Sequence, residues 1–225
     1  MRNELSAREA VLARIEAANA GPVADVETIS AAWQQLPRAY RRMGIRSLAE
    51  RLQLLEERLQ DYGAVVTRCR ESDIAEAVDR LLRQEGEAPS VVVPKGFPKA
   101  WLPVQIETVE DDDLSARTLE RFDVVLTGAS MAIAETGTLV LQNVPGQGRR
   151  VATLVPDFHL CVVRACDVVE TVPEAFLRLA TTSTLPTTFV SGPSATADIE
   201  MTRIKGVHGP RFLSVLLVED ASGLC

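Results

Sequence analysis

Residues 64–93, AVVTRCRESDIAEAVDRLLRQEGEAPSVVV, contain the pattern that decides the fold class. A short apolar run at 64–67 precedes a stretch whose apolar residues recur at helical spacing, namely Ile74, Ala77, Val78, Leu81 and Leu82. Asp73 and Glu76 predict a capping box at the start of this helix, and a second apolar run follows at 91–93. A strand, a helix and a strand in this order predict a right-handed crossover and parallel pairing of the two strands.

The sequence after this unit continues to alternate between strand and helix patterns. The acidic run at 110–113 predicts the start of a helix, because negative charge suits the positive end of the helix dipole. Another helix is predicted after Asp167, with Pro173 near its first turn. The other apolar runs predict strands, and the short gaps from 138 to 163 favour an antiparallel meander: 123–127, 138–142, 151–155, 159–163, 187–190 and 212–218. We therefore expect residues 64–225 to form an α/β domain, with a mixed sheet flanked by helices.

Residues 1–63 predict an N-terminal helical arm in front of this domain. Two helical stretches are expected before residue 40, and Pro37 is expected to kink or break the second. Ser47 and Glu50 predict a capping box for a third helix that ends at Gly63. Its apolar stripe consists of Leu48, Leu52, Leu55, Leu59 and Tyr62. The stripe could pair with a partner helix, but we favour packing on the chain's own core, because sustained coiled coils need more heptads.

Composition and charge narrow the classes of function. The 225 residues carry a formal net charge of −7, which gives no support to an electrostatic nucleic-acid binder. No apolar run approaches the roughly 20 residues that span a bilayer, so no membrane span is predicted. The charged N-terminus, MRNELSAREA, lacks the apolar stretch of a signal peptide. We expect a cytoplasmic protein.

The cysteines do not suggest a metal centre. Cys69, Cys161, Cys166 and Cys225 form no CxxC pair. Iron–sulfur and zinc sites need several thiolates close together, usually with short gaps between them. Cys161 and Cys166 are five residues apart, an odd spacing that sends them to opposite faces of a strand. We expect no metal site and no iron–sulfur cluster on this chain; any other cofactor is left open.

Three segments carry the residues best suited to chemistry, all on loops at predicted strand ends, where open α/β sheets place their sites. The first is TGASMAIAETGT, residues 127–138, in which Gly128 and Gly137 permit unusual backbone conformations. Glu135 is the only acid between Asp123 and Asp157, beside the hydroxyl groups of Thr136 and Thr138. Its carboxylate could act as a base or a nucleophile, or could hold the loop by accepting backbone hydrogen bonds.

The second segment is SGPSATADIE, residues 191–200. A strand, a glycine-containing loop and a helix start are predicted here, a geometry that offers backbone N–H groups to an anion. Its candidate ligand-binding residues are Ser191, Gly192, Ser194, Thr196 and Asp198. Alternatively, Ser194 is only the helix N-cap and Asp198 its first-turn partner. The absence of GxxxxGK[ST] and GxGxxG patterns weighs against ATP and NAD.

The third segment is GVHGPR, residues 206–211, where His208 and Gly209 lie on a predicted tight turn. The imidazole of His208 could donate a hydrogen bond or carry a proton, or could stabilise the turn. His159 is expected to be a strand residue bonded to neighbouring backbone. Arg149 and Arg150 could balance a substrate carboxylate, although a solvated hairpin tip is the default interpretation.

Four stretches in this order resemble the LUD-domain family, in its lactate utilisation C type: TGASMAIAETGTLVLQN, GRRVATLVPDFHLCVV, FVSGPSATADIE and KGVHGPRFLSVLLVED. The resemblance covers roughly residues 64–220. It implies an α/β fold similar to the sugar-phosphate isomerase and CoA-transferase-like group. The resemblance also implies that the protein acts together with iron–sulfur partner proteins in oxidising L-lactate to pyruvate. The partner proteins, and not this chain, would carry the cysteine ligands of the clusters.

By this resemblance, residues 135–137 match the family's ETGT turn, 191–200 its SGPS loop and 208–210 its HGP turn. One departure is Ala195, which stands where a basic residue is expected, so an anionic ligand would be bound more weakly or differently. The expected function is a cluster-free component of an L-lactate utilisation system that binds a small anionic ligand between these loops. The alternatives are a stand-alone acyl/CoA-transferase-like or isomerase-like enzyme using Glu135, and a non-catalytic interaction subunit.

Overall fold

The computed structural model describes residues 6–21, 25–84, 86, 88–197, 203–205 and 208–219, and it divides into two compact units, 1–40 and 41–225. The first unit contains α1 (Ala7–Asn19) and α2 (Val26–Gln35), and neither helix has a buried residue. Helix α2 ends before Pro37, as the sequence predicts. None of the helices in the described ranges is both long enough and apolar enough to cross a bilayer.

Six strands form a wholly parallel sheet in the second unit. Their order is β1 (Val65–Arg70), β12 (Phe212–Glu219), β7 (Phe158–Arg164), β4 (Val124–Gly128), β2 (Val91–Pro94) and β3 (Thr108–Asp111). The inner strands β7, β4 and β2 are buried along almost their whole length. Such continuous apolar strands are typical of a parallel sheet that is covered on both faces.

The strand–helix–strand unit of residues 64–93 is present, but its two strands are not neighbours. β1 and β2 lie in the same parallel sheet with β12, β7 and β4 between them. The connection between them contains α4 (Ile74–Leu82), whose five predicted apolar residues are all buried. β12 pairs along the whole of β1. The predicted direct pairing of β1 with β2 is therefore wrong, because β12, which is distant in sequence, pairs with β1. No pattern within residues 64–93 indicates this pairing.

Four shorter strands form a second sheet, in the order β8 (Val168–Val169), β5 (Met131–Ile133), β6 (Thr138–Gln142) and β9 (Thr187–Val190). β6 is antiparallel to both of its neighbours, whereas β5 and β8 are parallel. The α/β class, with helices flanking strands of both directions, is confirmed. The meander is wrong, since residues 151–155 form turns closed by short-range backbone hydrogen bonds and β7 joins the parallel sheet.

Two predictions about helix starts are also wrong. The acidic run at 110–113 ends β3 instead of opening a helix, and α5 (Ala116–Leu119) begins after its N-cap Ser115. The carboxylate of Asp111 instead receives the guanidinium of Arg149. Asp73 makes no capping bond, because a 3₁₀ turn at Glu71–Asp73 precedes α4. At residues 110–113 and at Asp73 the charge pattern fits a helix N-terminus. Asp111 instead binds Arg149, which is distant in sequence, and Asp73 lies in the 3₁₀ turn.

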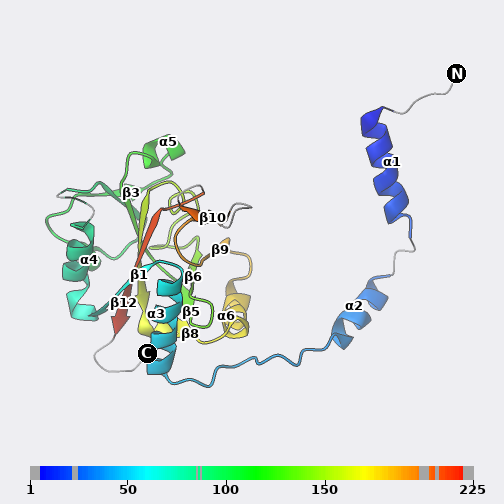
Figure 1. Cartoon of the computed structure of the whole chain (residues 1–225), viewed down its shortest axis with the longest axis horizontal. Coiled ribbons are helices and arrows are strands. Elements are labelled where there is room, and N and C mark those ends of the chain that lie inside the picture. The colour runs from blue at the N-terminus through cyan, green and yellow to red at the C-terminus, as the bar shows by residue number, and fades with distance from the viewer. Residues whose placement is uncertain are drawn as a thin grey trace. The chain divides into compact units, whose positions relative to one another are not determined.

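Helices α3 (Leu48–Asp61) and α4 cover opposite faces of the parallel sheet (Figure 1). The Ser47–Glu50 capping box is formed as predicted. Leu52, Leu55 and Leu59 are buried in a core shared with β7, β12 and the second sheet. The leucine stripe thus packs on the chain's own core, and α3 lies in the second unit although the sequence analysis places it in the arm. Helix α6 (Val172–Leu179) packs on the other face of the second sheet.

Candidate functional site

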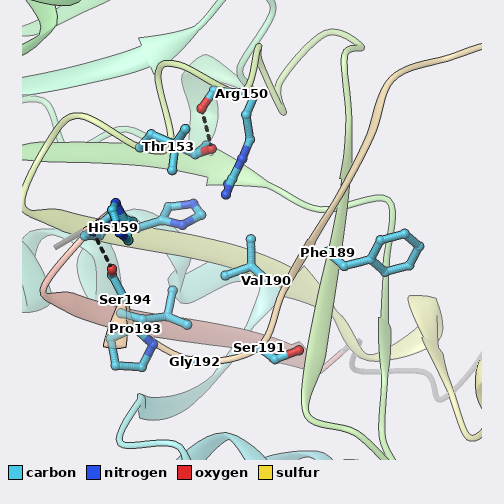
Figure 2. Close-up of a pocket in the computed structure, with 14 residues that line it drawn as sticks. Arg150, Thr153, His159, Phe189, Val190, Ser191, Gly192, Pro193 and Ser194 are labelled. Atoms are coloured by element: carbon cyan, nitrogen blue, oxygen red, sulfur yellow. Dashed lines mark hydrogen bonds between the residues drawn. The ribbon is translucent and has the colours of Figure 1, made fainter. Parts of the chain in front are cut away.

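A cavity of about 300 Å³ opens beside the first residues of β7 and β12. Its floor includes His159 and Leu213, which are paired across these two strands. One side is formed by the turns at 150–154, and the other by the loop at 191–194 (Figure 2). The turn at 208–210 also lines the cavity. We call this hollow the His159 cavity.

The His159 cavity lies at the amino end of two parallel strands. Open α/β sheets more often bind ligands at the carboxyl ends of their strands, as we expected here. The difference arises because the second sheet covers one face of the parallel sheet and brings the end of β9 above His159. The site is therefore built on a face of the sheet, between the turns and the second sheet.

The structure brings together five of the candidate residues at this cavity: Ser191, Gly192, Ser194, His208 and Gly209. Two hydrogen bonds join the loop to the turn. The backbone N–H of Ser194 donates to the carbonyl of Pro210 at 2.8 Å, and the backbone N–H of His208 donates to Ser194 Oγ at 3.2 Å. Segments that are remote in sequence thus form one wall of the cavity.

The chain does not enter a helix directly after Ser194. Ala195–Ala197 form β10, which pairs antiparallel with β11 (Arg203–Lys205). Thr196 lies in β10 with its backbone opposite Ile204, and Asp198 lies outside the described residues. A helix N-terminus starting at Ser194 is therefore wrong as the source of anion-binding N–H groups.

The ETGT turn reaches the rim of the cavity through hydroxyl groups. Thr136 Oγ1 and Thr138 Oγ1 are 2.7 Å apart, and Thr138 Oγ1 is 2.7 Å from Ser191 Oγ. Two glycines allow the turn and the loop to approach the end of α3. Both have positive φ angles, and an added Cβ would lie 2.8 Å from Arg58 Cβ at Gly137 and 2.5 Å from Tyr62 Cβ at Gly192.

Glu135 and Gly128 do not line the His159 cavity. The carboxylate of Glu135 pairs with Arg41 and lies 3.8 Å from a guanidinium nitrogen of Arg46. Gly128 ends β4, where its N–H donates to the carbonyl of Gly146 at 2.8 Å. The structure therefore separates these two residues from the serine loop and the histidine turn.

Arg150 and His159 line the cavity although neither was a principal candidate. Arg149 is held by Asp111, whereas Arg150 reaches toward the space between His159 and Val190 (Figure 2). The adjacent arginines were the available signal, but the sequence did not show which one is free. His159 Nε2 lies 2.8 Å from Thr127 Oγ1, so the expected bond to backbone is replaced by one to a side chain.

The imidazole of His159 is held in its neutral form. Its burial, and then the positive charge of Arg150, lower the pKa of His159 from 6.5 to about 4. At neutral pH the ring therefore serves as a hydrogen-bonding group on the cavity floor, while Arg150 supplies positive charge.

Within the described ranges, no group of three or more His, Cys, Asp or Glu side chains is placed to hold a metal ion. Cys69, Cys161 and Cys166 form no disulfide in the described part of the chain. Burial raises the pKa of Cys161 to about 12, so its thiol stays protonated at neutral pH.

A family model and two curated proteins show what the sequence of this chain is similar to. A family model described as the LUD domain matches residues 49–218. Lactate utilization protein C of Deinococcus radiodurans is 45% identical over 175 residues, covering 76% of this chain and 81% of that protein. Lactate utilization protein C of an Exiguobacterium species is 30% identical over 183 residues, covering 73% and 79%.

A solved structure supports the fold. The crystal structure of a DUF162 family protein from Deinococcus radiodurans is similar, with a TM-score of 0.67 and 39% sequence identity. The similarity covers 77% of this chain and 99% of that one. Together with the family match over residues 49–218, these similarities show that the chain belongs to the LUD-domain family.

Proposed function

We propose that this protein is a cytoplasmic, cluster-free component of an L-lactate utilisation system that oxidises lactate to pyruvate. The observation that carries the proposal is the 45% identity to a protein named lactate utilization protein C over most of both chains. In this proposal the chain acts with iron–sulfur proteins, which accept the two electrons released from lactate, and it binds a small anionic ligand in the His159 cavity.

The lining of the His159 cavity supports the ligand part of the proposal. It contains the side chains of Arg150, His159 and His208, together with the hydroxyl groups of Thr153 and Ser194. Among the residues that the structure describes, no Asp or Glu lines the cavity, although the chain has 31 acidic residues. The positive charge of Arg150, with no acidic side chain among the described lining residues, favours binding of an anion in this cavity.

The geometry of Glu135 gives less support to a stand-alone transferase or isomerase. A nucleophile or base must lie within reach of the reacting atom, and Glu135 faces Arg41 and Arg46 outside the cavity. Its ion pairs favour a structural role, which leaves an accessory component of a lactate-oxidising assembly as our conclusion.

The proposal is tested by deleting the gene in its own host, in a strain without a paralogue. We expect growth on L-lactate as sole carbon source to be lost and growth on pyruvate to be normal, because only the oxidation step is missing. Wild-type protein supplied in trans should restore growth, and Glu135→Gln should restore it as well. Normal growth of the deletion strain on L-lactate would overturn the proposal.

The role of partner proteins is tested separately with the purified chain. We expect it to contain no stoichiometric iron or acid-labile sulfide, and we expect extracts of the deletion strain to lose lactate-dependent reduction of a dye. Activity should return when the purified chain is added back. Stoichiometric iron and sulfide on the chain itself would contradict a cluster-free component.

A further inference from the structure

The guanidinium of Arg150 has no acidic partner among the described residues. The neighbouring Arg149 shows the contrast, because it donates to both carboxylate oxygens of Asp111 at 2.8 and 2.7 Å. Arg150 is instead directed into the His159 cavity (Figure 2), where partial burial lowers its pKa from the ordinary value. A guanidinium that points into a cavity and has no acidic partner among the described residues can bind an anion through charge-assisted hydrogen bonds.

The groups around Arg150 can supply further hydrogen bonds to the same anion. The carbonyl of Arg150 accepts a bond from Thr153 Oγ1 at 3.1 Å, which holds the turn that carries the arginine. Ser194 Oγ accepts a bond from the backbone N–H of His208, and its hydroxyl can also donate a hydrogen bond to a ligand. His159 is held by its bond to Thr127. The donors are thus held by contacts within the protein.

The cavity also has apolar groups on its walls and floor, beside the polar Ser191. Leu154, Val190, Pro193, Pro210 and Leu213 contribute to its walls and floor. Its volume of about 300 Å³ equals the share of about ten water molecules in the liquid. A three-carbon acid such as lactate can pair with Arg150 but leaves most of these apolar walls against water. Covering them gives binding free energy only to a ligand with an apolar part.

We infer that the His159 cavity takes a ligand larger than lactate, with a carboxylate or phosphate group on an apolar body, and that Arg150 binds the anionic group. This inference rests on the anion site of the proposed function and specifies its ligand class. The apolar body lies between the turns at 150–154 and the loop at 191–194. L-Lactate itself is then not the molecule that fills this site.

Calorimetric titration of the full chain with five probes tests the inference. Phenyl phosphate and L-3-phenyllactate carry an anion on an apolar ring, inorganic phosphate and L-lactate carry the anion alone, and benzyl alcohol carries the ring alone. We expect at least one of the two ring-bearing anions to bind about 10-fold or more tightly than its small counterpart, and benzyl alcohol not to bind. The tighter of the two identifies whether the head group is a phosphate or a carboxylate.

Substitutions place the binding at Arg150. Arg150→Gln should weaken binding of the ring-bearing anion by about 10-fold to 100-fold, the usual contribution of a charged hydrogen bond. Arg117→Gln is the matched control, since it removes the same charge from an exposed position on α5 and should leave binding unchanged. Arg150→Lys keeps the charge without the planar guanidinium group and should bind the ring-bearing anion with intermediate affinity. It takes the place of Arg150→Gln in the test if that variant does not fold.

Three results would overturn the inference: equal affinity for the small and the ring-bearing anions, equal affinity for benzyl alcohol, or no binding of any probe. An unchanged affinity in folded Arg150→Gln would remove Arg150 from the site. The growth assay tests the lactate role, and its outcome does not depend on these binding measurements. A deletion strain that grows on L-lactate while the ring-bearing anions bind removes the lactate role and leaves the ligand class in place.

Discussion

His159 shows at the scale of one residue how the fold changes the chemistry of a side chain. The ring is 1% exposed, lies on the cavity floor and is bonded to Thr127. In the unfolded chain the imidazole regains its ordinary pKa of about 6.5. Between that pH and about 4, the unfolded chain binds a proton that the folded chain does not, so acid favours unfolding.

This difference predicts a pH-dependent stability that belongs to His159. As the pH falls from 7 to 5, the residue should remove about 2 kcal/mol from the free energy of unfolding, with little further loss below about pH 4. His159→Gln retains a side chain that can bond to Thr127 but does not titrate. Urea unfolding of both proteins at pH 7 and pH 5 measures the effect. Parallel losses of stability in the two proteins would contradict the assignment.

At the scale of an element, the segment before α3 is held by one buried carboxylate. Glu170 is 0% exposed and accepts hydrogen bonds from the backbone N–H groups of Ile45 and Arg46, at 2.7 and 2.6 Å. The guanidinium groups of Arg41 and Arg46 lie 2.9 and 2.8 Å away. Burial alone would raise the pKa of Glu170, but these N–H groups and positive charges outweigh it and hold the pKa below its ordinary value.

Two carboxylates share these arginines, and they provide a matched pair of substitutions. Glu170→Gln should lower the free energy of unfolding by about 3 kcal/mol, because a buried site built around a carboxylate loses the charge that two backbone N–H groups and two guanidinium groups face. Glu135→Gln should cost less than about 1 kcal/mol, since the side chain of Glu135 is 36% exposed and its pairing is screened by water. Chemical denaturation of the two variants measures both values. Equal losses would show that burial does not decide the difference.

Elements were predicted well where the deciding contacts are local. The capping box of Ser47 and the spacing of the α3 leucines lie within one helix, and both predictions are confirmed. The strand predicted from the apolar run at 151–155 is wrong, because the backbone hydrogen bonds of these residues close turns. The helix predicted after Ser194 is wrong because these residues pair as a strand. Its partner strand, Arg203–Lys205, follows only after an interval that shows no strand pattern.

At the scale of the whole molecule, the described residues of 41–225 form one packed unit, and those of 1–40 contribute to no core cluster. All four core clusters belong to residues 41–225, and α1 and α2 have no buried residue. Exposed apolar side chains on α2 include Ile29 and Trp33. The stability of the LUD-domain unit should therefore not depend on the two helices.

Two truncations test this expectation. Removal of residues 1–40 should change the free energy of unfolding of the remaining unit by no more than about 0.5 kcal/mol, because neither α1 nor α2 contains a buried residue. Removal of residues 1–47 should cost about 3 kcal/mol, since Glu170 loses the backbone N–H groups of Ile45 and Arg46 and both arginine partners, and α3 loses its N-cap Ser47. Urea unfolding of the full chain and both truncations measures the difference. A large loss from the shorter truncation would show that the arm contributes to the folded unit.

The sequence by itself determined the α/β class, the leucine face of α3 and the serine, glycine and histidine residues that line the cavity. These depend on periodicity, on helix caps and on the tendency of glycine-rich segments to form loops, all of which act over a few neighbouring residues. Only the tertiary structure decided the strand order, the position of the site at the amino end of β7 and β12, and the separation of Glu135 from it. It also decided that Arg149 binds Asp111 while Arg150 faces the cavity, because pairing between distant segments is selected by the burial and charge balance of the whole fold.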